Sequence, residues 1–276
     1  MSKTRLWSLL LLVFGLLAAV AVAGCGDDGD STDSTTASGD VETITEGILT
    51  VGTDTPYPPF EIGQPPDITG FDIEVVNAIA EELGLTPEYT DTSFDTIFRD
   101  TAAGQFDLAA AASTITPARE KVVAFSDPYY ESQQALVVAE GSDIASVDDL
   151  SGAVVGAQDA TTGETYANDE TDAAEVRGFP EGPDAIAAVA TGQVDAAIID
   201  QPVAVDAVEK QGGLEIAAEI PTEEFYGFAM PIDNTSLQDG VNEALATIAE
   251  NGTLADLYDK YFQSEVPEAV LSGLGQ

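Results

Sequence analysis

The chain has 276 residues and a formal net charge of −42, because eight Lys and Arg residues face 50 Asp and Glu residues. So acidic a surface repels phosphate backbones, which excludes nucleic acid as a partner. The chain has no His and a single Cys, which excludes an intrachain disulfide, a thiolate zinc site and a Cys-based catalytic dyad. A charge excess of this size suits a salty medium, so we hypothesise that folding depends on salt.

The N-terminus carries the features of an export signal. Lys3 and Arg5 precede an uncharged apolar run over residues 6–23, which leads into the tetrapeptide Val-Ala-Gly-Cys. This tetrapeptide resembles the lipobox of lipoproteins, which implies a signal peptide over residues 1–24 and lipid attached to Cys25. An uncleaved transmembrane anchor and a plain secretory peptide are the alternatives. All three place the remainder outside the cytoplasm, and the lipobox implies an extracytoplasmic protein anchored to the cell membrane by lipid.

A polar segment follows the signal. Residues 26–46 consist predominantly of Gly, Asp, Ser and Thr and contain no aromatic residue. Such a segment cannot bury enough apolar surface to fold. Residues 25–46 are therefore expected to be the lipidated Cys and a flexible acidic linker that holds the folded part away from the membrane.

The folded region begins near Gly47 and alternates strands with helices. Residues 48–51 predict a buried strand, and residues 52–60, with three prolines, predict a loop. From Phe71 the apolar residues recur at helical spacing on one face, and Gly84 supplies the stop. Strand, helix and strand continue to alternate, which indicates parallel α/β sheets.

An internal repeat indicates two lobes of similar build. Residues 103–110 resemble residues 191–198, since in each a helix ends at Gly and a buried strand starts just past an Asp. Two crossings between the lobes make a hinge, and the cleft between two α/β lobes is the expected ligand site. The expected domains are lobe 1 at residues 47–136 and 227–263, lobe 2 at residues 137–226, and a C-terminal tail at residues 264–276.

Arg119 is the first candidate binding residue, because basic residues are scarce in this chain. It follows a strand expected over residues 108–112, and Thr116 and Pro117 suit the N-cap and first position of a helix, which would place Arg119 in its first turn. A cation is unfavourable there beside the helix dipole, and holding a carboxylate is one reason for it. A surface salt bridge with a neighbouring acid is the alternative.

Lobe 2 offers further candidates. Thr161 and Thr162 follow a strand and precede a helix, so they either cap that helix or present hydroxyl and N–H groups to the same carboxylate. Asp200 ends the buried strand at residues 196–199, where open α/β sheets bind their ligands, and either caps a loop or binds an ammonium group. Arg on one side and Asp on the other outline a free α-amino acid.

At these residues the chain resembles the extracellular solute-binding proteins of polar-amino-acid ABC transporters, family 3. The resemblance runs from about Gly47 to Phe262. It implies the two-lobe α/β periplasmic-binding-protein fold (Venus flytrap, type II) with a hinge of two crossings, which closes on its ligand. The motifs that carry it are Asp-Thr-Pro-Tyr-Pro-Pro-Phe-Glu at 54–61, Gly-Phe-Asp-Ile-Glu-Val at 70–75, Thr-Ile-Thr-x-x-Arg at 114–119 and Phe-Ser-x-Pro-Tyr-Tyr at 125–130.

The resemblance assigns roles around the main-chain part of an amino acid. Arg119 would grip the α-carboxylate, and Thr114 and Thr162 would add hydrogen bonds. Asp200 would hold the α-ammonium. Ala112 stands where the family often has Gly or Ser, so only its backbone carbonyl would serve, and a side-chain hydroxyl contact is lost.

The resemblance also indicates which residues would contact the side chain of the ligand. Tyr57 and Phe94 would sandwich it, with packing in the core as the alternative, and Asp54 would meet its polar end. Gln158 lies where the family varies with ligand and would tune selectivity. Asp54 beneath two aromatic rings favours a basic side chain through cation–π contact, whereas a hydrogen bond to Asp54 alone would suit Gln.

The function implied is the substrate-binding component of an ABC importer. It would capture a polar L-amino acid outside the cell and deliver it to a permease served by a cytoplasmic ATPase. The chain is expected to be a monomer without catalytic residues, cofactor or metal, and not an enzyme. A periplasmic dehydratase of aromatic precursors on the same fold, and a ligand sensor for a separate membrane partner, are the alternatives.

Overall fold

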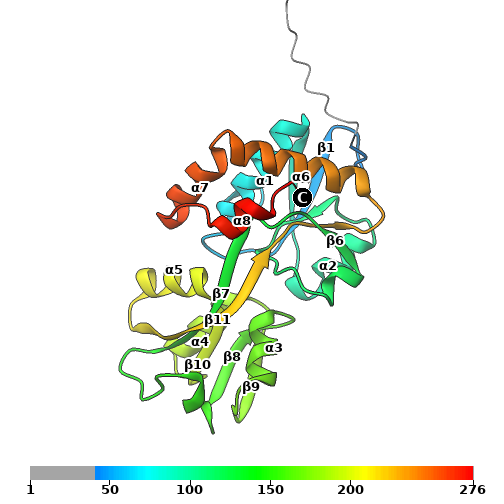
Figure 1. The fold of residues 1–276 in the computed structure, drawn as a ribbon. Helices are drawn as coiled ribbons and strands as arrows, with labels where there is room; N and C mark the ends of the chain where they lie inside the picture. The colour runs from blue at the N-terminus through cyan, green and yellow to red at the C-terminus, as the bar shows by residue number, and fades with distance from the viewer. Residues whose placement is uncertain (1–40, 276) are drawn as a thin grey trace, which may run out of the picture. The chain divides into compact units, whose positions relative to one another are not determined.

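The structure is a computed structural model that describes residues 41–275 (Figure 1). The expected signal peptide, Cys25 and most of the expected linker lie outside the described residues. Between residues 41 and 275, no helix combines the length and the apolar character that crossing a bilayer requires.

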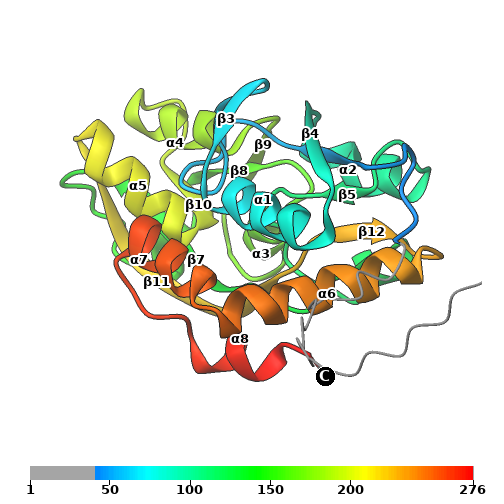
Figure 2. The same ribbon diagram turned by 90° about the horizontal axis from the view of Figure 1, so that it is seen from above.

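The first sheet has five strands in the order β4-β1-β5-β12-β6, and we call the half built on it lobe 1. The neighbours of β1 run parallel to it, whereas β12 runs antiparallel to β5 and β6. Helices α6 and α7 pack against α1, and Figure 2 shows α1 beside α6. The strands are β1 (Ile48–Thr53), β4 (Thr86–Asp91), β5 (Leu108–Ala109), β6 (Val123–Phe125) and β12 (Ala229–Pro231), and the helices are α1 (Phe71–Leu83), α2 (Phe94–Ala102), α6 (Thr235–Glu250), α7 (Thr253–Phe262) and α8 (Glu268–Gly273).

The second sheet has the order β11-β7-β10-β8-β9, and we call the half built on it lobe 2. Strands β10, β8 and β9 are parallel, whereas β7 is antiparallel to both β10 and β11. The expected parallel sheets are therefore each interrupted by one antiparallel strand, β12 in lobe 1 and β7 in lobe 2. The strands are β7 (Tyr130–Ala139), β8 (Val154–Gln158), β9 (Glu175–Phe179), β10 (Ala196–Asp200) and β11 (Leu214–Tyr226), and the helices are α3 (Thr162–Asp169), α4 (Gly182–Ala190) and α5 (Gln201–Gln211).

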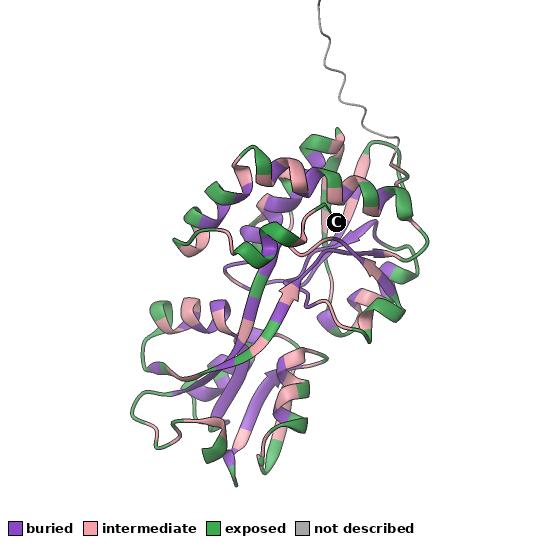
Figure 3. Cartoon of the chain, in the orientation of Figure 1, coloured by how far each residue is buried: buried purple, intermediate pink, exposed green. Residues whose placement is uncertain are grey.

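Four short elements complete the described chain. Strands β2 (Ile62–Gln64) and β3 (Asp67–Thr69) pair as a hairpin of their own. Single 3₁₀ turns form at η1 (Arg119–Lys121) and η2 (Val147–Leu150). Figure 3 shows the inner strands of the two large sheets mostly buried, with exposed residues along the outer sides of the helices.

The two crossings are β7 and β11, which lie side by side in Figure 1. An aromatic cluster anchors their ends in lobe 1. The ring of Phe60 lies 5.1 Å from that of Tyr130 in β7 and 5.5 Å from that of Tyr226 in β11. Such ring contacts add to the free energy of burial. The ends of both crossing strands are thus held in lobe 1 by the same packed rings.

Helix α1 confirms the helix predicted from Phe71. Its C-cap, Gly84, takes the left-handed conformation at φ 68° that favours glycine. At the other end, a Cβ on Gly70 would lie 2.0 Å from the carbonyl oxygen of Phe60. Only glycine therefore lets the loop that precedes the helix pass this close to the residues around position 60.

The internal repeat is also confirmed, and its two Asp residues have a structural role. Asp107 accepts hydrogen bonds from the backbone N–H of Thr50 at 2.8 Å and of Ile44 at 2.7 Å. Asp195 accepts one from the backbone N–H of Val154 at 2.7 Å. In each lobe the Asp that precedes a strand binds the start of the strand beside it.

Residues 41–46 correct the expectation of a flexible linker up to residue 46. Val41 packs partly buried against the core, over Gly240 of α6, where a Cβ would lie 2.6 Å from its Cγ1. Ile44 donates its N–H to Asp107, as described above. The two apolar residues in this polar segment mark the part that folds against lobe 1.

The C-terminal residues form more than a tail. Val270 in α8 is fully buried, and the N–H of Gly275 donates to Asp127 at 2.8 Å. Strand β7 begins at Tyr130, earlier than the expected opening of lobe 2 at residue 137. The exact boundaries of the lobes stay a prediction.

The segment around Arg119 differs from its expected secondary structure. The strand expected over residues 108–112 ends at Ala109, since Ala112 takes a left-handed φ of 42°. In place of the helix expected from Thr116, the chain forms only the single 3₁₀ turn η1. Strand β6 begins two residues after this turn, at Val123, which leaves no room for a longer helix.

Candidate functional site

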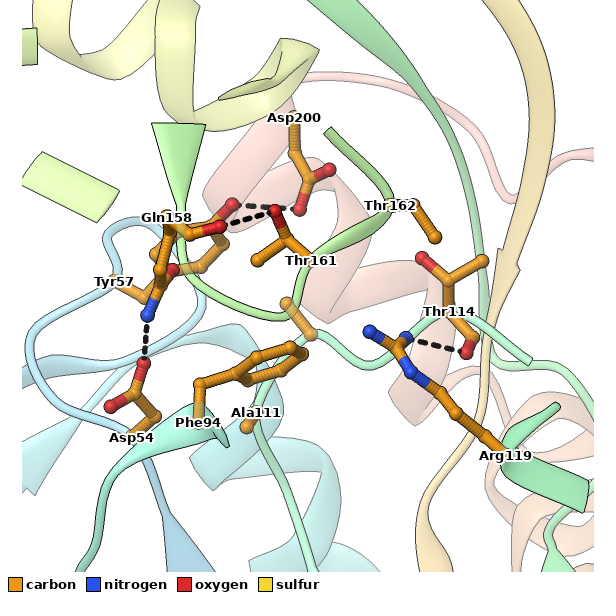
Figure 4. A pocket seen from close by; sticks show the side chains of 11 residues that line it. Asp54, Tyr57, Phe94, Ala111, Thr114, Arg119, Gln158, Thr161, Thr162 and Asp200 are labelled. Atoms are coloured by element: carbon orange, nitrogen blue, oxygen red, sulfur yellow. Dashed lines mark hydrogen bonds between the residues drawn. The ribbon is translucent and has the colours of Figure 1, made fainter. Parts of the chain in front are cut away.

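One cavity lies where loops of both lobes meet (Figure 4). All nine expected ligand residues line it, together with Ala111 and Thr161. Their roles in binding stay a prediction, but the structure brings them to one place. The lining is Asp54, Tyr57, Phe94, Ala111, Ala112, Thr114 and Arg119 from lobe 1, and Gln158, Thr161, Thr162 and Asp200 from lobe 2.

Arg119 lies at one wall of the cavity and makes no ion pair within residues 41–275. Its guanidinium donates to the carbonyl oxygens of Thr114 at 2.8 Å and Ala160 at 3.2 Å. It also lies over the rings of Phe94 and Phe98, 5.1 and 4.6 Å from their centroids. Burial lowers the pKa of Arg119 to about 10, against the opposing effect of nearby carboxylates. The surface salt bridge considered from the sequence is not what the structure shows.

Asp200 lies across the cavity at the end of β10, with 8% of its surface exposed. The hydroxyl of Tyr57 donates to its Oδ2 at 2.8 Å, and the amide of Gln134 donates to its Oδ1 at 2.5 Å. Burial first, and then the charge of Glu224, raise the pKa of Asp200 to about 7. Asp200 makes no side-chain cap to helix α5, so it faces the cavity and not the following turn.

The side chain of Tyr57 reaches Asp200 because the residue of lobe 2 that lies against its ring is a glycine, Gly182. A Cβ on Gly182 would lie 2.5 Å from Cε2 of Tyr57. The ring of Tyr57 is 6% exposed, so it is both a cavity wall and part of the core. Burial and the charge of Asp200 raise the pKa of Tyr57 well above its ordinary value, which keeps the phenol a hydrogen-bond donor.

Asp54 marks the opposite end of the cavity. Gln158 donates its amide N–H to Asp54 Oδ2 at 2.7 Å and to the carbonyl of Pro180 at 3.0 Å. Asp54 is 3% exposed, and its Oδ1 has no hydrogen-bond partner among the described residues. Burial, followed by the charge of Glu181, raises the pKa of Asp54 to about 7. A carboxylate with an unfilled acceptor therefore faces this end.

The two threonines of lobe 2 have different roles. Thr161 is the cap of α3, since its Oγ1 accepts the N–H of Glu164 at 3.0 Å. Its own hydroxyl donates to the carbonyl of Gln158 at 2.8 Å. Thr162 instead donates its hydroxyl to Glu224 at 2.7 Å. The helix-capping alternative thus holds for Thr161, and the hydroxyl of Thr162 remains beside the cavity.

Ala112 is held in place from behind the cavity. Its backbone N–H donates to Oδ2 of Asp72 at 2.9 Å, and the hydroxyl of Tyr129 donates to the same oxygen at 2.7 Å. A left-handed φ of 42° is unfavourable for Ala and costs about 1 kcal/mol or more. Ala112 therefore carries local backbone strain that a glycine at this position would not.

Two buried polar residues beside the cavity escaped the sequence analysis. Gln134 in β7 and Glu224 in β11 are 1% and 5% exposed, and Gln134 donates to Glu224 at 2.9 Å. Glu224 stands in a segment with several other acids, and no local pattern separates it from them. Only the pairing of β7 with β11 shows that it points inward. Among residues 41–275, no group of three or more acidic or thiol side chains is arranged to hold a metal ion.

Comparisons with known proteins agree with this architecture. Residues 49–264 match the model of the bacterial extracellular solute-binding proteins, family 3. The arginine-binding periplasmic protein of Mannheimia haemolytica is 33% identical over 211 residues, which cover 74% of this chain and 87% of that protein.

Two solved structures of reconstructed ancestral proteins are also similar. An ancestral arginine-binding protein, solved bound to glutamine, shares 36% identity with a TM-score of 0.76, over 80% of this chain and 100% of that one. The ancestral amino-acid-binding protein AncCDT-1, a precursor of cyclohexadienyl dehydratase, shares 35% identity with a TM-score of 0.74, over 78% of this chain and 96% of that one.

Proposed function

Because the chain belongs to the bacterial extracellular solute-binding proteins of family 3, we propose that it captures a polar L-amino acid with a basic side chain. It acts as the substrate-binding component of an ABC importer, as a monomer held to the cell membrane through lipidated Cys25. It delivers the ligand to a permease served by a cytoplasmic ATPase. The relatives compared above are described as amino-acid-binding proteins.

The observation that carries this proposal is the placement of charge around the cavity. Arg119 has a guanidinium without an ion pair in the described chain, and Asp200 lies in the facing lobe. A guanidinium binds a carboxylate through two parallel hydrogen bonds, and a carboxylate binds an ammonium group. The α-carboxylate of an amino acid therefore suits Arg119, and its α-ammonium suits Asp200.

The side chain of the ligand extends toward Asp54. The unfilled Oδ1 of Asp54 requires an N–H donor, and the charges of Glu181 and Asp91 add to the negative field there. A guanidinium or ammonium group supplies both the donor and the compensating charge. The amide of glutamine would supply only the donor. The acidic end thus favours arginine or lysine.

Closure follows from contacts that join the lobes. Tyr57 bonds to Asp200, and Gln158 bonds to Asp54, each across the cavity. A ligand that touches Arg119 in one lobe and Asp200 in the other adds contacts only when the lobes are together. It therefore stabilises the closed state by shifting the population toward it.

The test is calorimetric titration of the purified chain without its expected signal peptide, residues 26–276, against the twenty amino acids. Binding of L-arginine or L-lysine that is lost in Arg119→Ala supports the proposal. Binding of L-glutamine alone keeps the amino-acid class and contradicts the basic side chain. No binding of any amino acid contradicts the proposal as a whole.

A second candidate function is a dehydratase of aromatic precursors. It is favoured by the similarity to AncCDT-1 and by the pKa values of about 7 for Asp54 and Asp200, the range that suits a general acid. Incubation with prephenate or arogenate decides it, because formation of an aromatic product would establish an enzyme. Unchanged precursor would leave the binding function alone.

A further inference from the structure

Glu224 lies at the end of the crossing strand β11, between the two threonines of the cavity. The pairing of β11 with β7 shifts register between Ile220 and Glu224, and Glu223 in this irregular stretch has a φ of 50°. Glu224 is thereby turned into the interior, whereas Glu223 is exposed. Burying a carboxylate in such a position costs free energy of folding unless hydrogen-bond donors surround it.

Four donors surround the carboxylate of Glu224. The hydroxyls of Thr114 and Thr162 both reach Oε2, at 2.5 and 2.7 Å. The amide of Gln134 and the hydroxyl of Thr222 reach Oε1, at 2.9 and 2.8 Å. An ionised carboxylate only accepts hydrogen bonds, so all four groups donate to it.

This arrangement fixes where the threonine protons point. A hydroxyl group has one proton, and Thr114 and Thr162 each give theirs to Glu224. The amide of Gln134 has two N–H protons, which are directed to Asp200 and Glu224, so its longer 3.3 Å approach to Thr162 lacks a proton. Both threonine oxygens therefore keep lone pairs for the cavity and have no proton to offer it.

A hydroxyl without a proton to offer cannot donate to the α-carboxylate. It can accept an N–H of an ammonium group. Together with Asp200, the two threonines present three acceptors, which matches the three N–H donors of a free α-ammonium. Figure 4 shows these three side chains around the cavity, and Arg119 remains the side-chain donor for the carboxylate.

We propose that Glu224 is a positioning residue that makes the site specific for a free α-ammonium, by holding the hydroxyls of Thr114 and Thr162 as pure acceptors. The proposal rests on the proposed amino-acid-binding function and deepens it. Thr114 belongs to lobe 1 and Thr162 to lobe 2, and they meet on one oxygen of a crossing strand. Recognition of the ammonium is thereby tied to closure.

Replacing Glu224 by Gln inverts this arrangement. The amide oxygen would accept from Gln134 and Thr222, so the amide N–H groups would face the two threonines. Each threonine oxygen would then accept from the new amide, and its proton would turn toward the cavity. The site would lose acceptors for the ammonium with almost no change in shape.

The experiment compares each amino acid with the compound that lacks only its α-amino group. Titration calorimetry would use L-arginine against 5-guanidinopentanoic acid, and L-glutamine against glutaramic acid, with the native chain (residues 26–276) and Glu224→Gln. The native chain is expected to bind the amino acid at least about 100-fold more tightly than its partner compound, and the variant less than about 10-fold. The matched control is Glu223→Gln, which removes the same charge from the exposed neighbour and should keep the native ratio.

A double-mutant cycle with Thr114→Val separates positioning from general stability. If Glu224 acts through this hydroxyl, the losses of Glu224→Gln and Thr114→Val are strongly non-additive. Thr114→Val also tests the same acceptor should Glu224→Gln fail to fold. A native ratio that persists in Glu224→Gln, or additive losses, would overturn the inference while amino-acid binding stands. A native chain that binds none of the four compounds would overturn the proposed function with it.

Discussion

The carboxyl groups of Glu61 and Asp72 are both buried inside lobe 1, where both oxygens of Glu61 and Oδ1 of Asp72 have no hydrogen-bond partner among the described residues. Two buried carboxylates that lack donors repel each other when both are ionised, which favours a pair that carries a proton. Burial and the charge of Asp72 raise the pKa of Glu61 well above its ordinary value, and burial raises that of Asp72 to about 6. Asp72 in turn holds the N–H of Ala112 at the cavity wall.

This pair predicts that stability depends on pH. Both carboxyl groups have a raised pKa in the folded state, so folding binds protons. Their contribution is complete below the ordinary carboxyl pKa of about 4 and is lost as the pH rises through the folded values. We expect the free energy of unfolding to fall by on the order of 2–3 kcal/mol between pH 5 and pH 8. Urea unfolding at the two pH values measures this difference.

The matched variant is Glu61→Gln, whose amide can donate to Asp72 at every pH. It should lose the part of the pH-dependent decrease that the pair contributes and keep the part that comes from Asp54 and Asp200, whereas Glu81→Gln on the exposed surface should behave like the native chain. An equal decrease in Glu61→Gln and the native chain would show that the pair does not share a proton.

Ala112→Gly is expected to stabilise the protein. At a φ of 42° glycine relieves the steric strain of the Cβ, so we expect a gain of about 0.5–1 kcal/mol despite the entropy of the unfolded chain. Ala111→Gly, at the neighbouring buried position without a positive φ, should destabilise. Thermal and urea unfolding of the two variants compare them directly, and a loss of stability in Ala112→Gly would contradict the strain.

Arg119→Lys is expected to weaken ligand binding by at least about 30-fold, because an ammonium keeps the charge and loses the two-pronged geometry. Lysine would also lose one of the two carbonyl contacts and the position over the rings of Phe94 and Phe98. Calorimetry with L-arginine measures the affinity. Arg99→Lys serves as the control, since Arg99 is exposed and pairs with Asp100. Equal affinity in Arg119→Lys would argue against carboxylate recognition by this residue.

Binding of a basic ligand is expected to strengthen as the pH rises from about 5.5 to 8. Asp54 and Asp200 have pKa values of about 7, so both gain negative charge over this range. In Asp54→Asn the preference for L-arginine over L-glutamine should fall by about 10-fold or more. Asp95→Asn, on the exposed start of α2, should keep it. An unchanged preference in Asp54→Asn would contradict the role of the acidic end.

The net charge of −42 predicts that folding responds to salt. Repulsion among the exposed carboxylates is screened at molar ionic strength, so the melting temperature should rise steadily from low to molar NaCl. Calorimetric melts across this range test it, with potassium chloride as a comparison for specific sodium binding. A melting temperature that does not change with salt would remove the support for a salty habitat.

Sequence motifs predicted the lining of the cavity well, because each motif stands at the end of a strand. Arg119, Thr162 and Asp200 come from distant segments, and the alternating α/β order alone brings such strand ends to one edge. Helix α1 was likewise predicted from a local pattern, as was the repeated motif that contains Asp107 in lobe 1 and Asp195 in lobe 2. These features depend on residues close to one another in the chain.

What could not be predicted depends on partners far apart in sequence. Glu224 is one acid among several, and its inward direction follows from a register shift against β7. The Glu61–Asp72 pair and the strained φ of Ala112 also arise only in the folded chain. Residues 41–46 were interpreted as linker because their composition is polar, whereas two apolar residues and the carboxylate of Asp107 suffice to bind them.

The attachment of residues 41–46 to lobe 1 also determines where a mechanical pull would enter the protein. The hydrogen bond from Ile44 to Asp107 and the packing of Val41 on α6 join the incoming chain to the first sheet. Tension along the preceding chain would therefore be borne by lobe 1 and not by the crossing strands β7 and β11.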